Sequence, residues 1–171
     1  MIGYWLSPAE PARAWFVSTT GELARKYHAP VFEPHVTLYS GGDEEDEHAR
    51  SLIDRIAIRT GAIELQVGGV EHSEKFTKTL FVQLRASESA RQLSDAIRAG
   101  SESPRDYHFN PHVSLLYAHI PHVAKVAETE RIHVPFDHVR FDALAAVFFP
   151  KPIETGDDVE NWRIIGKATL L

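Results

Sequence analysis

The chain repeats a short pattern, Pro-His-Val-hydroxyl-Leu, at residues 34–38 and again at residues 111–115. The hydroxyl residue is Thr37 in the first copy and Ser114 in the second. With this chain's composition, two matches to Pro-His-apolar-[Ser/Thr]-apolar would arise in about one shuffled chain in 10⁴. Each copy alternates polar and apolar residues, a pattern typical of a half-buried β-strand. The repeat therefore predicts two similar strands, each with an aliphatic face in the core.

The hydrophobic pattern around the two copies predicts an alternation of strands and helices. The expected strands are residues 2–6, 31–42, 62–72, 78–86, 112–120, 136–149 and 162–171, and the expected helices are 7–27, 43–57, 87–100 and 122–131. This order divides into two halves, and each half has one motif strand followed by a helix. We expect an α+β fold in a single bilobal domain over residues 1–171, with two antiparallel sheets facing each other across a central cleft and helices outside.

The start of the first helix carries a local signal. Ser7 followed three residues later by Glu10 predicts a capping box, and Pro8 would occupy the first helical position. Pro11 would lie in the first turn or delay the true start by a few residues.

Composition limits the classes of partner. The chain has 171 residues, a formal net charge of −6 and no cysteine. The lack of cysteine excludes disulfides, zinc knuckles and a thiol nucleophile. A net negative charge argues against affinity gained by neutralising many phosphates of a long nucleic acid. A small anionic ligand, held by local dipoles, is compatible with this composition.

The sequence also bears on location. It has no apolar run of the roughly 20 residues that a membrane-spanning helix needs. Its beginning lacks the basic and apolar regions of a signal peptide. We therefore expect a cytoplasmic protein without a membrane partner. The sequence leaves the oligomeric state open, and we take a monomer as the expectation.

The two motif strands present chemically useful side chains. Because residues i and i+2 of a strand share a face, His35 lies beside Thr37, and His112 lies beside Ser114. Two imidazoles can supply one general base and one general acid on opposite sides of a phosphorus atom. The hydroxyls can donate hydrogen bonds to its non-bridging oxygens. Tyr39 shares the predicted face of His35 and is a further candidate. This chemistry needs no cofactor.

Other chemistries find less support. The chain has ten histidines, but it has no His-Glu-x-x-His motif, and carboxylates do not cluster beside the two motifs. We therefore expect no metal site. Neither a Gly-x-Ser-x-Gly nucleophile elbow nor a glycine loop with a phosphate-binding lysine is present.

Two His-apolar-[Thr/Ser]-apolar motifs, separated by a helix-strand-strand-helix segment, resemble those of the 2H phosphoesterase superfamily. "PVFEPHVTL", and "NPHVSLLY" with Tyr117 five residues after the second histidine, are most similar to its cyclic phosphodiesterase branch. The resemblance covers nearly the whole chain, from the opening "YWL" strand to the closing "NWRIIGKATL".

This resemblance implies an activity. Members of the branch open 2',3'-cyclic nucleotides, or ADP-ribose 1'',2''-cyclic phosphate, to a 2'-phosphomonoester type of product without a metal. The two motifs would face each other across a water-filled cleft. His35 and His112 would be the acid-base pair, and the near symmetry of the motifs leaves open which one is the base.

The resemblance also implies a set of binding residues. Thr37 and Ser114 would hold the phosphate, Tyr117 would line its site, and Phe76 would lie under the base. Tyr117 is an odd number of residues from His112, so only a β-bulge or a strand end could turn it to the same face.

Two alternatives remain open. The same site could act on RNA termini, as a cyclic-end phosphodiesterase or a 2',5'-RNA ligase-like enzyme. It could also belong to a module that binds a nucleotide without turning it over. The first would show strong salt dependence and a preference for oligonucleotides, and the second would bind product tightly without turnover.

Overall fold

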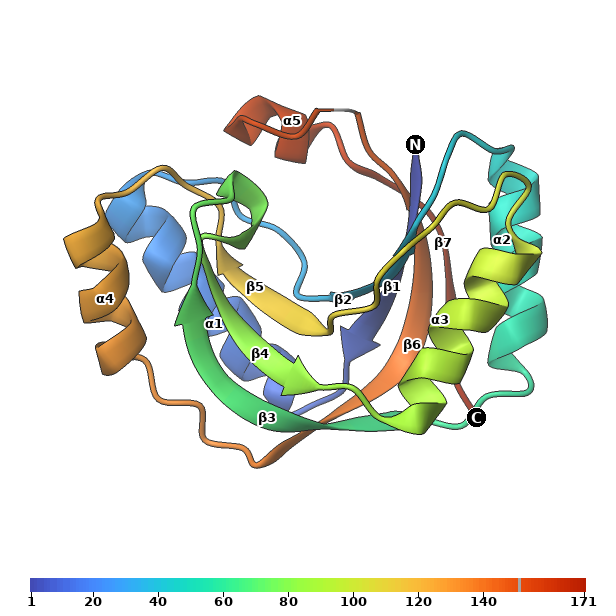
Figure 1. Ribbon diagram of the computed structural model, residues 1–171, viewed down its shortest axis with the longest axis horizontal. Coiled ribbons are helices and arrows are strands. Elements are labelled where there is room, and N and C mark those ends of the chain that lie inside the picture. Colours follow the sequence, from blue (N-terminus) through green and yellow to red (C-terminus); the bar gives the residue numbers. More distant parts are fainter. Residues whose placement is uncertain (151) are drawn as a thin grey trace.

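The computed structural model describes residues 1–150 and 152–171 (Figure 1). Its elements, in chain order, are β1 (Ile2–Pro8), α1 (Ala12–Tyr27), β2 (Val36–Ser40), α2 (Asp46–Ala57), β3 (Ile63–His72), the 3-10 helix η1 (Phe76–Lys78), β4 (Leu80–Arg85), α3 (Glu88–Gly100), β5 (His112–Leu116), α4 (His122–Arg131), β6 (His138–Phe148), α5 (Gly156–Glu160) and β7 (Arg163–Thr169).

The strands form one curled antiparallel sheet in the order β2-β1-β6-β3-β4-β5, and β7 also pairs with β6. This confirms the expected α+β class. The two expected sheets are joined, because residues 138–141 of β6 pair with residues 63–66 of β3. Along the same edge of β6, residues 143–148 pair with β7. Strand β6 therefore belongs to both halves of the sheet. The curl turns the two ends of the sheet, β2 and β5, towards each other (Figure 1).

The helices lie outside the curl. Helices α2 and α3 pack against the half of the sheet that contains β2, β6 and β7, whereas α1 and α4 pack against the half that contains β3, β4 and β5 (Figure 1). Among the described residues, no helix combines the length and the hydropathy needed to cross a bilayer.

The start of α1 differs from the prediction. Ser7 and Pro8 are the last residues of β1, and Pro8 pairs with Phe141 of β6. Helix α1 begins only at Ala12, with Pro11 as its N-cap and without a side-chain cap. The capping box predicted at Ser7 and Glu10 is therefore wrong, because strand pairing with β6 overrides the local helix signal.

Two short helical elements, α5 and η1, are absent from the predicted order of helices and strands. Helix α5 follows a capping box in which the Thr155 side chain and the Asp158 side chain each accept the other's backbone N–H. The turn between β3 and β4 contains η1, at Phe76–Lys78. In addition, the first motif strand is shorter than predicted, since β2 begins only at Val36.

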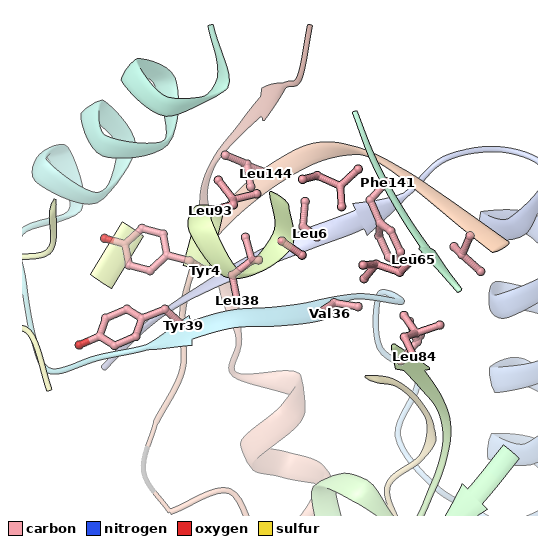
Figure 2. Close-up of a cluster of buried hydrophobic side chains, with 14 of the residues drawn as sticks. Tyr4, Leu6, Val36, Leu38, Tyr39, Leu65, Leu84, Leu93, Phe141 and Leu144 are labelled. Atoms are coloured by element: carbon pink, nitrogen blue, oxygen red, sulfur yellow. The ribbon is translucent and has the colours of Figure 1, made fainter. Parts of the chain in front are cut away.

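The largest cluster of buried hydrophobic side chains lies between the sheet and its helices (Figure 2). The aliphatic residues of both motifs, Val36, Leu38, Val113 and Leu115, are completely buried there, as the repeat predicts. Burying side chains of this kind stabilises a fold by about 1.5–3 kcal/mol each. The core therefore fixes one face of each motif strand and leaves the opposite face free for a site.

Candidate active site

The free faces of β2 and β5 line one pocket of about 470 Å³. The two motif segments together contribute His35, Thr37, Ser40, His112, Ser114 and Tyr117. Two residues half a chain apart in the sequence, His35 and His112, therefore lie at the same cavity, and each histidine lies beside the hydroxyl of its own motif.

The two histidines are oriented in the same way. The Nδ1 atom of His35 lies 2.7 Å from the carbonyl oxygen of Glu33, and Nδ1 of His112 lies 2.8 Å from the carbonyl oxygen of Asn110. A carbonyl oxygen only accepts, so in each ring Nδ1 carries the proton. The other nitrogen, Nε2, is then unprotonated and free to accept a proton at the pocket.

The surroundings of the two rings differ. The imidazole of His35 stacks on the indole of Trp5, with ring centroids 3.7 Å apart and an angle of 9° between the planes. Trp162 meets the same imidazole edge-on at 6.0 Å. His112 instead has the ring of Phe81 beside it at 5.5 Å, and this ring carries the ammonium group of Lys78 at 4.1 Å from its centroid. One histidine thus faces an aromatic wall and the other a cationic one.

Both imidazoles are neutral at pH 7 in the free protein. Burial lowers the pKa of His35 to about 4, an effect that the hydrogen bond to Glu33 opposes and the neighbouring His112 reinforces. Burial likewise lowers the pKa of His112 to about 4, with a further contribution from the ammonium groups of Lys78 and Lys75. A bound anion would reverse this trend, because negative charge nearby favours the imidazolium form.

The two hydroxyls are not equivalent. Thr37 makes no side-chain hydrogen bond within the part of the chain that the structure describes, so its hydroxyl is available to a ligand. Ser114 donates to the carbonyl oxygen of Thr77 over 3.0 Å. A ligand oxygen that takes the Ser114 proton must therefore draw this hydroxyl away from Thr77.

A β-bulge in each motif decides which aromatic residue reaches the pocket. In β2, Tyr39 pairs with Tyr4 and Thr37 with the following Trp5, so Leu38 is an extra residue. The bulge reverses the alternation of faces after Leu38. Tyr39 is consequently buried in the core, and Ser40 lines the pocket instead. The prediction that Tyr39 lines the site is therefore wrong.

The second motif has a bulge at the matching position. Leu116 pairs with Leu80 and Ser114 with Phe81, so Leu115 is the extra residue. This bulge turns Tyr117 into the pocket despite its odd spacing from the histidine. Its ring stacks on Phe32, with centroids 3.9 Å apart, and burial raises the pKa of its phenol, an effect that a hydrogen bond with Ser114 opposes.

Phe76 lies beside the pocket and not in its wall. It belongs to η1 and packs against Tyr117 and His119, with ring centroids 6.1 Å and 5.3 Å away. It lines a neighbouring cavity behind Tyr117. The structure therefore does not bring Phe76 to the place expected for a base platform.

Several pocket residues were not predicted. The aromatic ones are Trp5, Tyr107, Phe149 and Trp162, and the cationic ones are Lys75 and Lys78. Tyr107 donates from its hydroxyl to the backbone carbonyl of Thr37 over 3.2 Å, and burial raises its pKa to about 12. No carboxylate lines this pocket among the described residues, and they contain no group of three or more histidine and carboxylate side chains placed to hold a metal ion.

Comparison with known proteins identifies the family. Residues 7–147 match the 2'-5' RNA ligase superfamily, a span that includes both motifs and most of the sheet. The chain belongs to the 2'-5' RNA ligase superfamily. This confirms the resemblance to 2H phosphoesterases that the two motifs indicate. A comparison with curated protein sequences gives no match.

Several solved structures share the architecture of this chain. TT0787 of Thermus thermophilus superposes with a TM-score of 0.64 at 22% identity, over 99% of this chain and 97% of that one. Escherichia coli LigT in its apo form superposes with a TM-score of 0.59 at 14% identity, over 99% of this chain and 96% of that one. LigT complexed with 3'-AMP superposes with a TM-score of 0.57 at 15% identity, over 99% of this chain and 97% of that one. At these identities the likeness establishes the fold.

Proposed function

We propose that the protein is a metal-free cyclic phosphodiesterase that opens a ribose cyclic phosphate, such as a 2',3'-cyclic nucleotide or ADP-ribose 1'',2''-cyclic phosphate. The observation that carries this proposal is the pair of imidazoles at one pocket, each with Nδ1 bonded to a backbone carbonyl and Nε2 free. Once a bound phosphate has raised the pKa of one ring, that imidazole can give a proton while the other, still neutral, takes one.

The reaction balances with these groups alone. One neutral imidazole, of His35 or His112, removes a proton from water as the water oxygen bonds to phosphorus. The bond from phosphorus to the ribose 3' oxygen breaks, and the other imidazole, protonated in the bound state, gives its proton to that oxygen. The product is a 2'-phosphomonoester. Hydrogen bonds from the Thr37 and Ser114 hydroxyls stabilise the charge on the non-bridging oxygens.

Protonation of one histidine follows from substrate binding. In the free protein both pKa values lie near 4, so neither ring is an acid at neutral pH. The anionic phosphate attracts one proton into the pocket and raises the pKa of the ring that receives it. Binding and assembly of the acid-base pair are therefore coupled.

The size of the pocket and the known complexes agree with a nucleotide. A volume of about 470 Å³ lies within the range of roughly 300–1,000 Å³ that is usual for small-molecule sites. LigT has been solved in complexes with 3'-AMP, ATP and NADP+. These structures support nucleotide binding by this fold.

A second candidate is action on RNA termini. The family name points to it, and so do two lysines in the pocket wall, Lys75 and Lys78. In a 2',5'-RNA ligase-like reaction, a 5' hydroxyl replaces water as the nucleophile that the same base activates. Oligonucleotides would then be preferred over mononucleotides, and salt would weaken the reaction.

The test is hydrolysis of a panel of 2',3'-cyclic mononucleotides in the presence of EDTA, by the wild type and by the His35→Ala and His112→Ala variants. Each variant should lose about 10²–10⁴-fold in kcat, the usual contribution of a general acid or base. Circular dichroism controls for folding, because His35 is buried. Loss of wild-type activity on chelation would overturn the mechanism, and tight nucleotide binding without turnover would favour a binding module.

A further inference from the structure

The turn between β3 and β4 places two ammonium groups at the pocket. Lys75 precedes η1 and Lys78 ends it, and both side chains line the same cavity as the histidines. Lys75 is exposed and Lys78 is half-buried. They come from a segment that lies outside both motifs, and their one effect described above is to lower the pKa of His112.

This turn is held in place by three contacts. The ammonium group of Lys125, buried in α4, lies 2.7 Å from the carboxylate of Glu74. Ser73 donates from its hydroxyl to the carbonyl oxygen of Lys78 over 2.6 Å. Thr79 donates to the carbonyl oxygen of Ala118, just beyond β5, over 2.7 Å. The two lysines therefore project from a turn that is anchored to α4 and to the second motif.

Neither lysine is neutralised by a neighbour. Within the described residues, neither Lys75 nor Lys78 lies within 4.0 Å of a carboxylate, although Glu71 acts on Lys78 from farther away. The aromatic ring of Phe81 is the group that Lys78 contacts. The pocket thus carries two positive charges in a chain whose net charge is −6.

One phosphate does not account for two lysines. A cyclic phosphodiester carries a single negative charge, and the motif hydroxyls already face it. An unpaired ammonium group stabilises the protein very little, but it binds a phosphate strongly when it faces one in a partly desolvated pocket. Two free lysines on one wall indicate a ligand with negative charge beyond the reacting phosphate.

The rest of the pocket sets the orientation of such a ligand. The wall near His35 is aromatic, with Trp5, Trp162 and Phe149, and it suits a nucleobase. The wall near His112 is cationic, with Lys75 and Lys78. A nucleotide whose cyclic phosphate lies between the histidines would then direct its other anionic group away from the tryptophans and towards the lysines.

We infer that Lys75 and Lys78 form a subsite for a second phosphate group, carried by the substrate on the far side of its ribose. This inference rests on the proposed function in that the reacting phosphate lies between the two histidines. The substrate class is a ribose cyclic phosphate with a 5' phosphate, diester or diphosphate. Both an RNA 3' end and ADP-ribose 1'',2''-cyclic phosphate contain this chemistry, whereas a plain 2',3'-cyclic mononucleotide lacks it.

Calorimetric binding of two product analogues tests the subsite without any turnover. Adenosine 2',5'-bisphosphate should bind the wild type at least about tenfold more tightly than adenosine 2'-monophosphate at low salt. In the Lys75→Gln/Lys78→Gln double variant this ratio should fall to about one. The exposed Lys167→Gln serves as the matched control, since Lys167 lies in β7, does not line the pocket, and should leave the ratio unchanged.

The outcomes separate this inference from the proposed function. The proposed subsite is contradicted if the wild type binds the bisphosphate and the monophosphate with equal affinity. It is also contradicted if the double variant keeps the wild-type preference for the bisphosphate. An equal loss of affinity for both analogues also overturns it, because the lysines would then act on the reacting phosphate. If the ratio behaves as expected while cyclic phosphates are not hydrolysed, the subsite stands and the hydrolytic function falls.

Turnover identifies the source of the second phosphate. The values of kcat/KM are compared for 2',3'-cyclic AMP, for the dinucleotide ApA ending in a 2',3'-cyclic phosphate, and for ADP-ribose 1'',2''-cyclic phosphate. A higher kcat/KM for one of the two larger substrates, lost in the double variant, supports the subsite and identifies that substrate as the source of the second phosphate. Equal values for all three in the wild type contradict it.

Discussion

Trp5 and His35 form a near-parallel stack with ring centroids 3.7 Å apart, although they come from different segments of the chain. Trp5 pairs with Thr37, two residues after the histidine, so β1 and the first motif place the indole and the imidazole face to face. The second motif has no tryptophan stacked on His112 in the described residues, where the ring of Phe81 meets it edge-on. This contact orients one histidine of the pair and not the other.

We expect Trp5→Leu to lower kcat by about 10- to 100-fold with a smaller change in KM, because a reacting group displaced by about 1 Å costs up to about 10²-fold. Trp5→Phe keeps an aromatic surface under the imidazole and should retain most of the activity. Steady-state kinetics with a 2',3'-cyclic nucleotide measures both effects. If Trp5→Leu lowers thermal stability and leaves kcat intact, Trp5 is only a packing residue.

Acid should destabilise the protein through both histidines. Their pKa values are about 4 in the folded state, below the ordinary value of 6.5, so the unfolded state binds the protons first. The free energy of unfolding should therefore fall as pH drops from about 6.5 towards 4. Urea unfolding at pH 7.5, 6 and 5 measures this slope. The His35→Gln/His112→Gln variant should show a shallower slope, and an identical slope would contradict the assignment.

The pH dependence of catalysis should shift between free and bound enzyme. The profile of kcat/KM reports the free enzyme, in which both histidines titrate near 4, so its optimum should lie on the acid side of neutrality. The profile of kcat reports the complex and should lie at higher pH, because the bound phosphate raises the pKa of one imidazole. Superimposable profiles would show that the phosphate does not set the protonation state. Histidine NMR titrations with and without adenosine 2'-monophosphate provide an independent check.

The two bulges allow a matched pair of tyrosine variants. Tyr117→Phe removes a hydroxyl at the pocket and should lower kcat/KM by about tenfold, the effect of one hydrogen bond to a charged group. Tyr39→Phe removes the hydroxyl that accepts the backbone N–H of Arg105 and should cost about 0.5–1.5 kcal/mol of stability without affecting activity. Kinetics and thermal unfolding of both variants measure these effects, and the reverse pattern would contradict the assigned faces.

The sequence predicted the parts of the site that depend on local periodicity. Because residues i and i+2 of a strand share a face, the sequence predicts that His35 lies beside Thr37 and His112 beside Ser114. The structure places all four side chains at one pocket. The α+β class and the family likewise followed from element order and the repeated motif. Each of these signals can be read without knowing which strands pair with each other.

The parts that were missed depend on partners elsewhere in the chain. A bulge is a property of two strands, so nothing in the motif itself showed that Tyr39 would turn into the core. The same holds for Ser7 and Glu10, whose capping signal is overridden because β1 continues along β6 to Pro8. Lys75 lay between two predicted strands and Lys78 at the start of the second of them, and only the pairing of β4 with β5 brings them to the second motif.

Leu38 and Leu115 have a consequence for recognising sites of this kind in other sequences. Each is an extra residue in its strand, three positions after the histidine. The side chains that reach the pocket therefore lie two and five positions after the histidine, whereas a regular strand would place them at two and four. A pattern that compares positions at +2 and +5 from each histidine pairs Thr37 with Ser114 and Ser40 with Tyr117. Substrate selectivity among such proteins can then be sought in the +5 residue, where this chain's two halves differ most: one is small and the other is aromatic.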